Sequence, residues 1–277
     1  MNWLPTRWAR FSLRTLLVGV TVLCILLGTE VQRARKQHAA VAVVESRNGV
    51  VAYAAKGRIP DRAFSAFVRD WIGREYTDEV TSINLFRRKI GDAEMAAIGS
   101  LPSLEILNLY NTDVTDAGLD HLRHLSSLKL LSLDYTRITD IGLAELADLT
   151  NLESLSLMGT DVTDAGIAHL DGMKKLRSLA LGGTKVTDAS LKRLKAIESL
   201  GAIDLAVTGV TDEGLAHLKG LKHLKRLNLY GTGVTDVGIR HLAAVGTLQW
   251  LDITGLPITK SALVEFKSTL PRCRVRQ

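Results

Sequence analysis

The sequence has little with which to cross-link itself or to do covalent chemistry. Only two cysteines occur in 277 residues, and aromatic residues make up 5% of the chain. Cys24 lies in an apolar stretch near the start, whereas Cys273 lies in the tail, so the two are not expected to meet. We therefore predict neither a disulfide nor a zinc site.

Catalytic motifs are missing as well. The sequence contains no convergent set of nucleophile, base and orienting group, no glycine-rich phosphate loop and no metal-ligand spacing. It therefore predicts a protein that is not an enzyme and that uses no cofactor and no metal.

What the sequence does have is one pattern that returns every 24 residues. The stretch LEILNLYNTDVTDAGLDHLRHLSS begins at Leu104 and restarts without insertion. The restarts are Leu128, Leu152, Leu176, Leu200, Leu224 and Leu248. A weaker copy begins one period earlier, at Val80. A fixed period of this length is the signature of a repeat architecture.

Each part of the repeat predicts a structural element. The opening L-x-x-L-x-L alternates every second residue, which is typical of a short strand with one buried face. The closing G-L-x-x-L-x-x-L places its leucines on one face of a helix. The pair Thr115 and Asp116 and its equivalents lie between the two, where a hydroxyl and a carboxylate signal a helix start.

A single unit cannot bury its leucines, so the units should stack, with the strands in one parallel sheet and the helices outside it. Helices are wider than the roughly 4.8 Å between strands, so the stack should curve with the strands on the concave side. The L-x-x-L-x-L pattern resembles the leucine-rich-repeat family. Its V-T-D-x-G-L segment is most similar to ribonuclease-inhibitor and F-box-type repeats and to many bacterial repeats.

This resemblance covers roughly residues 80–266, or about eight repeats. It implies an α/β fold, a curved leucine-rich-repeat solenoid, but it does not identify a ligand. The residues before the repeats show no F-box-like segment, so a ubiquitin-ligase adaptor is not expected.

Residues 1–29 predict a basic N-terminus followed by a single transmembrane helix. No charge occurs between residues 15 and 29, and the run 11–29 would form a helix of roughly 28 Å, long enough to cross a hydrocarbon core. Trp3 and Trp8 would lie at the headgroups. Two alternatives remain, namely a cleaved signal peptide, although no small-x-small cleavage site follows, and a soluble core helix.

The positive charge gathers at the two ends of the chain. Residues 1–40 carry +5 and residues 260–277 carry +4, against +6 for the whole chain, so the rest is near −3. This distribution favours a membrane surface over nucleic acid as a partner. A slight excess of positive charge before the span places the repeats on the exported, extracytoplasmic side. The lack of paired cysteines at the ends of the array argues mildly against export.

The segments on both sides of the repeat array are predicted to form caps. Residues 30–79 predict a juxtamembrane helix and an N-terminal cap, with a turn at Asn48 and Gly49, a strand over 50–54 and a helix over 62–72. Within this segment, residues 41–79 are expected to cover the first repeat. Residues 267–277 read as a C-terminal cap or tail. A basic start, a span and a cap before such repeats resemble membrane-anchored bacterial leucine-rich-repeat proteins.

Three polar columns recur in the repeats, and a structural interpretation suits each. Threonines are expected to bond the turn backbone of neighbouring coils. Aspartates are expected to cap helix starts rather than to bind calcium, and histidines are expected to form a solvated helix face. The columns are Thr112, Thr136, Thr160, Thr184, Thr208 and Thr232; Asp92, Asp116, Asp140, Asp164, Asp188, Asp212 and Asp236; and His121, His169, His217 and His241.

Strand positions that alternate with the buried leucines should face outward on the concave side. Most of them are small, and the aromatic residues lie toward the two ends of the array. The candidate partner-binding residues are Tyr110 and Tyr135 at one end, and Arg226, Asn228, Tyr230, Trp250 and Asp252 at the other. Aromatic side chains mixed with arginine are typical of interface hot spots, although ordinary surface is the alternative.

The sequence thus predicts a non-catalytic, membrane-anchored scaffold that binds a protein or peptide on its concave face. Two other hypotheses remain. The same face could bind carbohydrate or another envelope polymer, since aromatic platforms beside Asp and Asn suit sugars, and an enzyme or enzyme adaptor is the least favoured.

Overall fold

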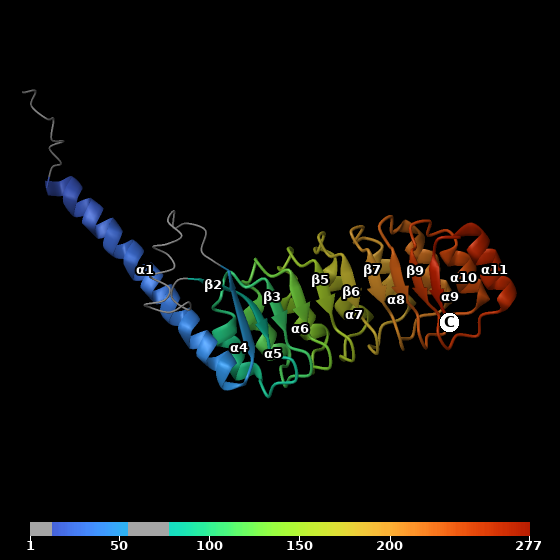
Figure 1. Cartoon of the computed structure of the whole chain (residues 1–277), viewed down its shortest axis with the longest axis horizontal. Helices are drawn as coiled ribbons and strands as arrows, with labels where there is room; N and C mark the ends of the chain where they lie inside the picture. Colours follow the sequence, from blue (N-terminus) through green and yellow to red (C-terminus); the bar gives the residue numbers. More distant parts are fainter. Residues whose placement is uncertain (1–12, 55–77) are drawn as a thin grey trace, which may run out of the picture.

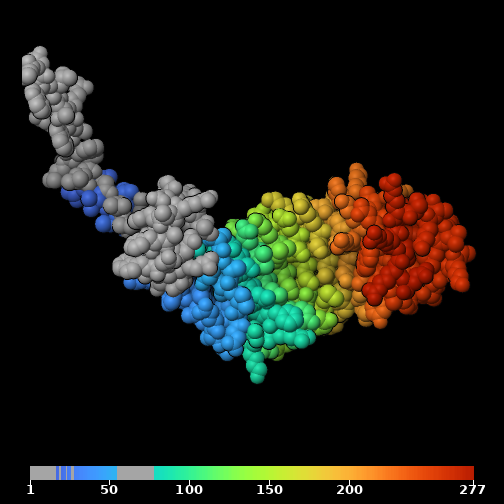
Figure 2. Space-filling model, viewed as in Figure 1, coloured from blue at the N-terminus to red at the C-terminus, as the bar shows by residue number. Residues whose placement is uncertain are grey.

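The computed structural model describes residues 13–54 and 78–277, apart from some side chains near the start of the first helix (Figure 1). The predicted basic segment 1–10 and the predicted helix over 62–72 lie outside the described residues. The other elements build one elongated body that runs from the N-terminal cap to the red C-terminal end (Figure 2).

The described strands form one ten-stranded sheet whose spatial order follows the chain. Strand β1 (Val50–Ala54) pairs antiparallel with β2 (Glu79–Asn84). From β2 onward the pairing is parallel, and successive strands from β2 to β9 pair residues that are 24 apart. The remaining strands are β3 (Ile106–Asn108), β4 (Leu130–Ser132), β5 (Ser154–Ser156), β6 (Ser178–Ala180), β7 (Ala202–Asp204), β8 (Arg226–Asn228), β9 (Trp250–Asp252) and β10 (Arg274–Arg276).

A short helix follows each strand of the array and packs against the next one, so the helices form a second layer. They are α4 (Asp92–Ile98), α5 (Asp116–Leu119), α6 (Asp140–Glu145), α7 (Asp164–Ile167), α8 (Asp188–Leu194), α9 (Asp212–Leu215), α10 (Asp236–Leu242) and α11 (Lys260–Thr269). Three continue as 3₁₀ turns: η1 (Asp120–Leu122), η2 (Ala168–Leu170) and η3 (Ala216–Gly220). The predicted unit of strand, cap and helix is confirmed.

The leucine columns fill the space between the two layers. Strand residues such as Leu107, Leu155 and Leu227 and helix residues such as Leu122 and Leu218 are at most 1% exposed. The architecture is the curved α/β solenoid that the repeat period predicts, because each coil leaves its leucines uncovered until the next coil is added.

Aspartate–threonine pairs join each coil to the next. Asp140, the first residue of α6, accepts hydrogen bonds from both the backbone N–H and the hydroxyl of Thr163, at 2.8 and 2.6 Å. Thr163 is in turn the N-cap of α7. The same two bonds recur in the pairs Asp92–Thr115, Asp116–Thr139, Asp164–Thr187, Asp188–Thr211, Asp212–Thr235 and Asp236–Thr259.

These pairs refine two predictions. The aspartates do lie at helix starts, but each carboxylate binds the N-cap threonine of the following helix. The threonines of the other column, such as Thr160, donate to the carbonyl three residues earlier in their own coil. The expectation that these threonines bond the turns of neighbouring coils was therefore wrong.

The same contact explains why the V-T-D-x-G-L motif contains a glycine. A Cβ on Gly166 would approach Asp140 Oδ1 within 2.3 Å, and one on Gly142 would approach Asp116 Oδ1 equally closely. Where Ser190 replaces the glycine, its hydroxyl and N–H both donate to Asp164. Lys260 stands where the next aspartate would be, and the series of pairs ends there.

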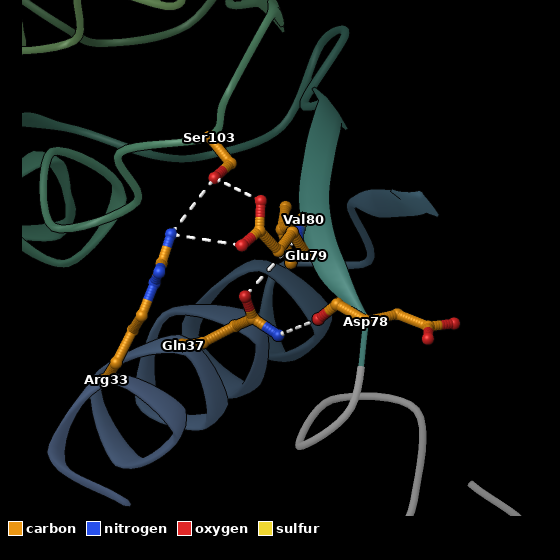
Figure 3. Close-up of polar contacts among 6 residues, drawn as sticks. All are labelled: Arg33, Gln37, Asp78, Glu79, Val80 and Ser103. Atoms are coloured by element: carbon orange, nitrogen blue, oxygen red, sulfur yellow. Dashed lines mark hydrogen bonds and ion pairs between the residues drawn. The ribbon is translucent and has the colours of Figure 1, made fainter. Parts of the chain in front are cut away.

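The N-terminal cap begins in helix α1 (Leu13–Ser46), whose last turns lie on the first repeat. Ala40 and Val44 are fully buried there. A polar cluster fixes the helix one turn earlier (Figure 3). Arg33 pairs with Glu79 at 3.1 Å and donates to Ser103, and the Gln37 side chain bonds the backbone of residues 78 and 80.

The first half of α1 projects away from the solenoid (Figure 1). Leu17, Val18 and Ile25 are 60%, 63% and 60% exposed. Within the residues searched, which are those the structure describes, no helix combines the length and apolarity that crossing a membrane requires.

The C-terminal residues form a strand as well as the predicted cap. Helix α11 buries Phe266, and β10 then pairs in parallel with β9. This strand could not be predicted from the sequence pattern, because Arg274 and Arg276 flank its single apolar residue. Cys273 is buried just before it, and burial raises the pKa of its thiol.

The Asp164→Ala variant tests the coil-to-coil pairs. We expect its free energy of unfolding at neutral pH to fall by about 2–3 kcal/mol, because hydrogen bonds to a charged group are lost and N–H groups are left unpaired. Urea unfolding followed by circular dichroism measures this. Asp161→Ala is the matched control, since the exposed Asp161 only pairs with Lys185 at 2.7 Å and should cost about 0–1 kcal/mol. Equal losses in the two variants would contradict the role of the pairs.

The effect of Asp164→Ala should also depend on pH. Burial raises the pKa of Asp164, but hydrogen bonds from Ser190 and Thr187 outweigh this, so the pKa lies below its ordinary value of 3.8. A lowered pKa stabilises the fold above the unfolded-state value and loses this contribution as the pH falls through the folded-state value. The difference between Asp164→Ala and the unchanged protein should therefore shrink below about pH 4.

Candidate binding surface

The outward side of the parallel sheet ends in a row of left-handed turns. In each coil, the third residue after the end of the strand has a positive φ. The row consists of Arg87, Asn111, Tyr135, Gly159, Gly183, Val207, Gly231 and Gly255. Glycine fills four of these positions because it alone adopts this conformation without strain.

Tyr135 and Val207 are the two bulky apolar residues in this row. Their φ angles are 54° and 55°, and they are 50% and 57% exposed. A left-handed conformation costs such a residue roughly 1–2 kcal/mol. Little burial offsets that cost, so these two side chains are held on the surface at the expense of stability.

An aromatic cluster, made of Phe86, Tyr110 and Tyr135, lies along the strand-end edge of the first coils. The rings of Phe86 and Tyr110 are stacked, with centroids 4.6 Å apart, and Tyr110 meets Tyr135 edge-on at 5.2 Å. The guanidinium of Arg87 lies 5.2 Å from the Phe86 centroid. The Tyr135 ring lies against Gly159, where a Cβ would come within 2.7 Å of it.

The structure thus brings together the predicted Tyr110 and Tyr135 and adds two residues that the prediction lacked. Phe86 is 44% exposed and lies 24 residues before Tyr110, in the same column of the repeat. The weak first copy, in which Arg88 replaces the usual threonine, hid this equivalence. Extending the column by one period would have found Phe86 and its neighbour Arg87.

The predicted residues at the other end do not form one cluster. Tyr230 is 47% exposed at the strand-end edge, beside Gly255. Arg226 and Trp250 are paired neighbours at the opposite edge, where β8 and β9 begin. Four residues of strand, or roughly 13 Å, separate these two edges.

Asn228 and Asp252 hold turns in place. The side chain of Asn228 accepts from the N–H of Tyr230 at 3.0 Å and donates to Asp204 at 2.9 Å. Asp252 is only 4% exposed; it accepts from the N–H and hydroxyl of Thr254 and pairs with Arg276. Asp252 is therefore not exposed as expected, because Arg276 on the strand added by the tail lies beside it and pairs with it.

The outer helices show no comparable site. His121, His169 and His241 are exposed and His217 is half-buried. Among the residues that the structure describes, no group of three potential ligands is placed to hold a metal ion.

The repeat, the sheet and the helical layer define a leucine-rich-repeat solenoid. A leucine rich repeat family model matches residues 102–162, and a second one matches residues 220–243. The fold of the chain is therefore that of a leucine-rich-repeat solenoid. No curated protein matches it.

Solved structures with a similar fold include two internalins of Listeria monocytogenes. Internalin inlF superposes with a TM-score of 0.50 at 20% identity, over 78% of this chain and 75% of that one. Internalin C2 (inlC2) has a TM-score of 0.49 at 23% identity, over 72% of this chain and 94% of that one. At such identities the likeness to inlF concerns the fold alone.

The Val207→Gly variant tests the strain in the row of turns. We expect the free energy of unfolding to rise by about 0.5–1 kcal/mol, because the left-handed turn is relieved and the lost side chain is mostly exposed. Gly183→Val is the reverse experiment in the same column, where a Cβ would meet nothing closer than 3.6 Å. It should lose a similar amount in urea unfolding, and a gain in stability would refute the argument.

Proposed function

We propose that this chain is a non-catalytic scaffold that binds a protein partner through the concave side of its sheet and is held at a membrane by the first half of α1. The observation that carries the proposal is the exposed aromatic cluster of Phe86, Tyr110 and Tyr135. Aromatic side chains are scarce in this chain, yet three of them meet on one outward-facing edge.

The conformational cost at Tyr135 supports binding. Glycine occupies the same turn in four other coils and would be more favourable there. Strained residues persist mainly at sites where they serve a function. A ring held outward over Gly159 offers a partner a large, rigid apolar surface that loses little conformational entropy on binding.

The chemistry around the cluster suits protein recognition. Arg87 adds a cation beside the rings, and arginine and tyrosine are the side chains enriched at interface hot spots. The carboxylate next to Tyr135 is already engaged, because Asp134 accepts hydrogen bonds from Ser132, Ser156 and the N–H of Met158.

The first half of α1 supports the membrane part of the proposal. Its exposed residues include Leu17, Val18, Val20, Val22 and Ile25, which at 100° per residue cover an arc of roughly 200°. Such a broad exposed apolar face is typical of a surface that contacts a membrane or a partner. The polar cluster at Arg33 then holds the solenoid to the same helix.

The partner-binding surface can be tested with a photo-reactive amino acid at Asn111, an exposed turn residue next to the aromatic cluster. We expect it to cross-link a protein in cells, detected by mass spectrometry. Tyr135→Gly should reduce the yield about tenfold or more, because a central aromatic anchor is lost. Glycine suits this turn, so the fold should persist.

Val207→Gly is the matched control, since it makes the same kind of change in the same column outside the cluster. It should leave the cross-link unchanged. An equal yield from a cross-linker at Lys192 on the outer helix α8, or no response to Tyr135→Gly, would refute binding through this face.

The anchor and its orientation can both be tested. Val18→Arg with Val22→Arg should release the chain from the membrane pellet, because each arginine costs about 2.5–3.5 kcal/mol at a helix centre in a bilayer. Val50→Arg, at a valine equally exposed on β1, is the control and should not release the chain.

The orientation is tested separately. A C-terminal reporter should be active on the exported side, and cytoplasmic activity would contradict the proposed orientation.

A further inference from the structure

The column just before each strand carries alternating charges in the first half of the array, and there they neutralise one another. Lys129 pairs with Glu105 at 2.8 Å, and Arg177 pairs with Glu153 at 3.8 Å. The same column then continues with Gly201, Lys225, Gln249 and Cys273. From Gly201 onward the acidic residues are missing, so the cation at Lys225 has no counterpart in the column.

A basic groove opens where the acids are missing. Its volume is about 830 Å³, and its lining consists of Lys225, Arg226, Gly246, Thr247, Leu248, Gln249, Trp250, Arg272 and Arg274. Four of these nine residues are cations and none is acidic. Of the ion pairs found among the described residues, none involves any of the four.

Trp250 lies between two of the cations. The parallel register pairs it with Arg226 on one side and with Arg274 on the other, each about 4.8 Å away across the sheet. Arg226 and Arg274 are exposed, and Trp250 is half-buried. The result is a row of guanidinium, indole and guanidinium along the strand-start edge.

A smaller hollow adjoins the groove along the same edge. This second hollow of about 390 Å³ shares Lys225 and is lined by Arg177, Ser199, Gly201 and His223. The two hollows follow the same edge over successive coils. The positive groups lie in a line with one aromatic side chain among them. This arrangement suits an extended ligand that carries several negative charges and an apolar or planar group between them.

We propose that this basic groove binds an acidic peptide segment of the protein partner, with carboxylates on Arg226, Arg274 and Lys225 and an apolar or aromatic side chain on Trp250. The inference rests on the proposed function, to which it adds the chemistry of the partner. It also makes recognition two-sided, because the aromatic cluster lies at the opposite edge and the opposite end of the sheet.

The test uses the full chain in a non-ionic detergent and two fluorescein-labelled peptides. One alternates glutamate with glycine around a central phenylalanine, and the other has glutamine in place of every glutamate. Fluorescence anisotropy should show binding of the acidic peptide alone, weakening as salt is added. Arg226→Glu with Arg274→Glu should weaken binding about tenfold or more, because attraction becomes repulsion, and Trp250→Ala should weaken it as well.

Lys192→Glu with Lys195→Glu is the matched control. It makes the same change in net charge on exposed residues in and directly after the outer helix α8, and it should leave binding unchanged. An equal loss of peptide binding in the control would show that net charge alone attracts the peptide, and it would contradict binding in the groove. If the protein binds polygalacturonate at equal charge concentration but does not bind the peptide, the ligand of the groove is an envelope polymer and the proposed peptide ligand is wrong.

The failure of this inference can be told apart from failure of the proposed function. If the protein cross-linked from Asn111 is captured equally well by Arg226→Glu with Arg274→Glu, the groove is not involved and the scaffold function stands. If nothing is cross-linked from Asn111 while the acidic peptide still binds, peptide binding in the groove is supported and partner binding at the aromatic cluster is contradicted.

Discussion

The structure depends on the bond between the aspartate of one coil and the threonine of the next. Stacked leucines supply most of the apolar burial, but burial is non-directional and sets no register. The carboxylate fixes the register, because it must meet both the N–H and the hydroxyl of a single residue in the next coil. The constant period follows, since an added residue would move the threonine out of reach.

The strand, the turn and the helix of each coil could be predicted from spacing, because the leucine positions report directly which faces are buried. Contacts between coils could not be predicted in the same way. The aspartate column looked like a set of caps within single helices, and only the stacking shows that Asp140 serves the helix that Thr163 begins. The glycine of the motif had no explanation until the neighbouring carboxylate was in place.

The candidate surface was predicted in part for a similar reason. Alternation along a strand tells which residues point outward, so Tyr110 was found, and Tyr135 was named with it as a nearby aromatic residue. It does not tell which outward residues a later strand will cover, and Asp252 is buried by β10, whose sequence has no leucine pattern. Nor does it show which polar side chains hold the turns, as Asn228 does. Bonds formed outside the repeat leave no periodic trace. The turn bond of Asn228 does recur in its column, at Asn84, Asn108, Asp204 and Asp252, but the spacing alone does not show which atoms meet.

The absence of insertions between coils has a consequence for the reach of the molecule. Because every junction uses the same pair of residues, a whole coil could be gained or lost by recombination without creating a new kind of junction. Each such event would change the separation between Tyr135 and Trp250 by one strand spacing, roughly 4.8 Å. The number of coils therefore sets the distance between the two proposed recognition elements, which a single ligand would have to bridge.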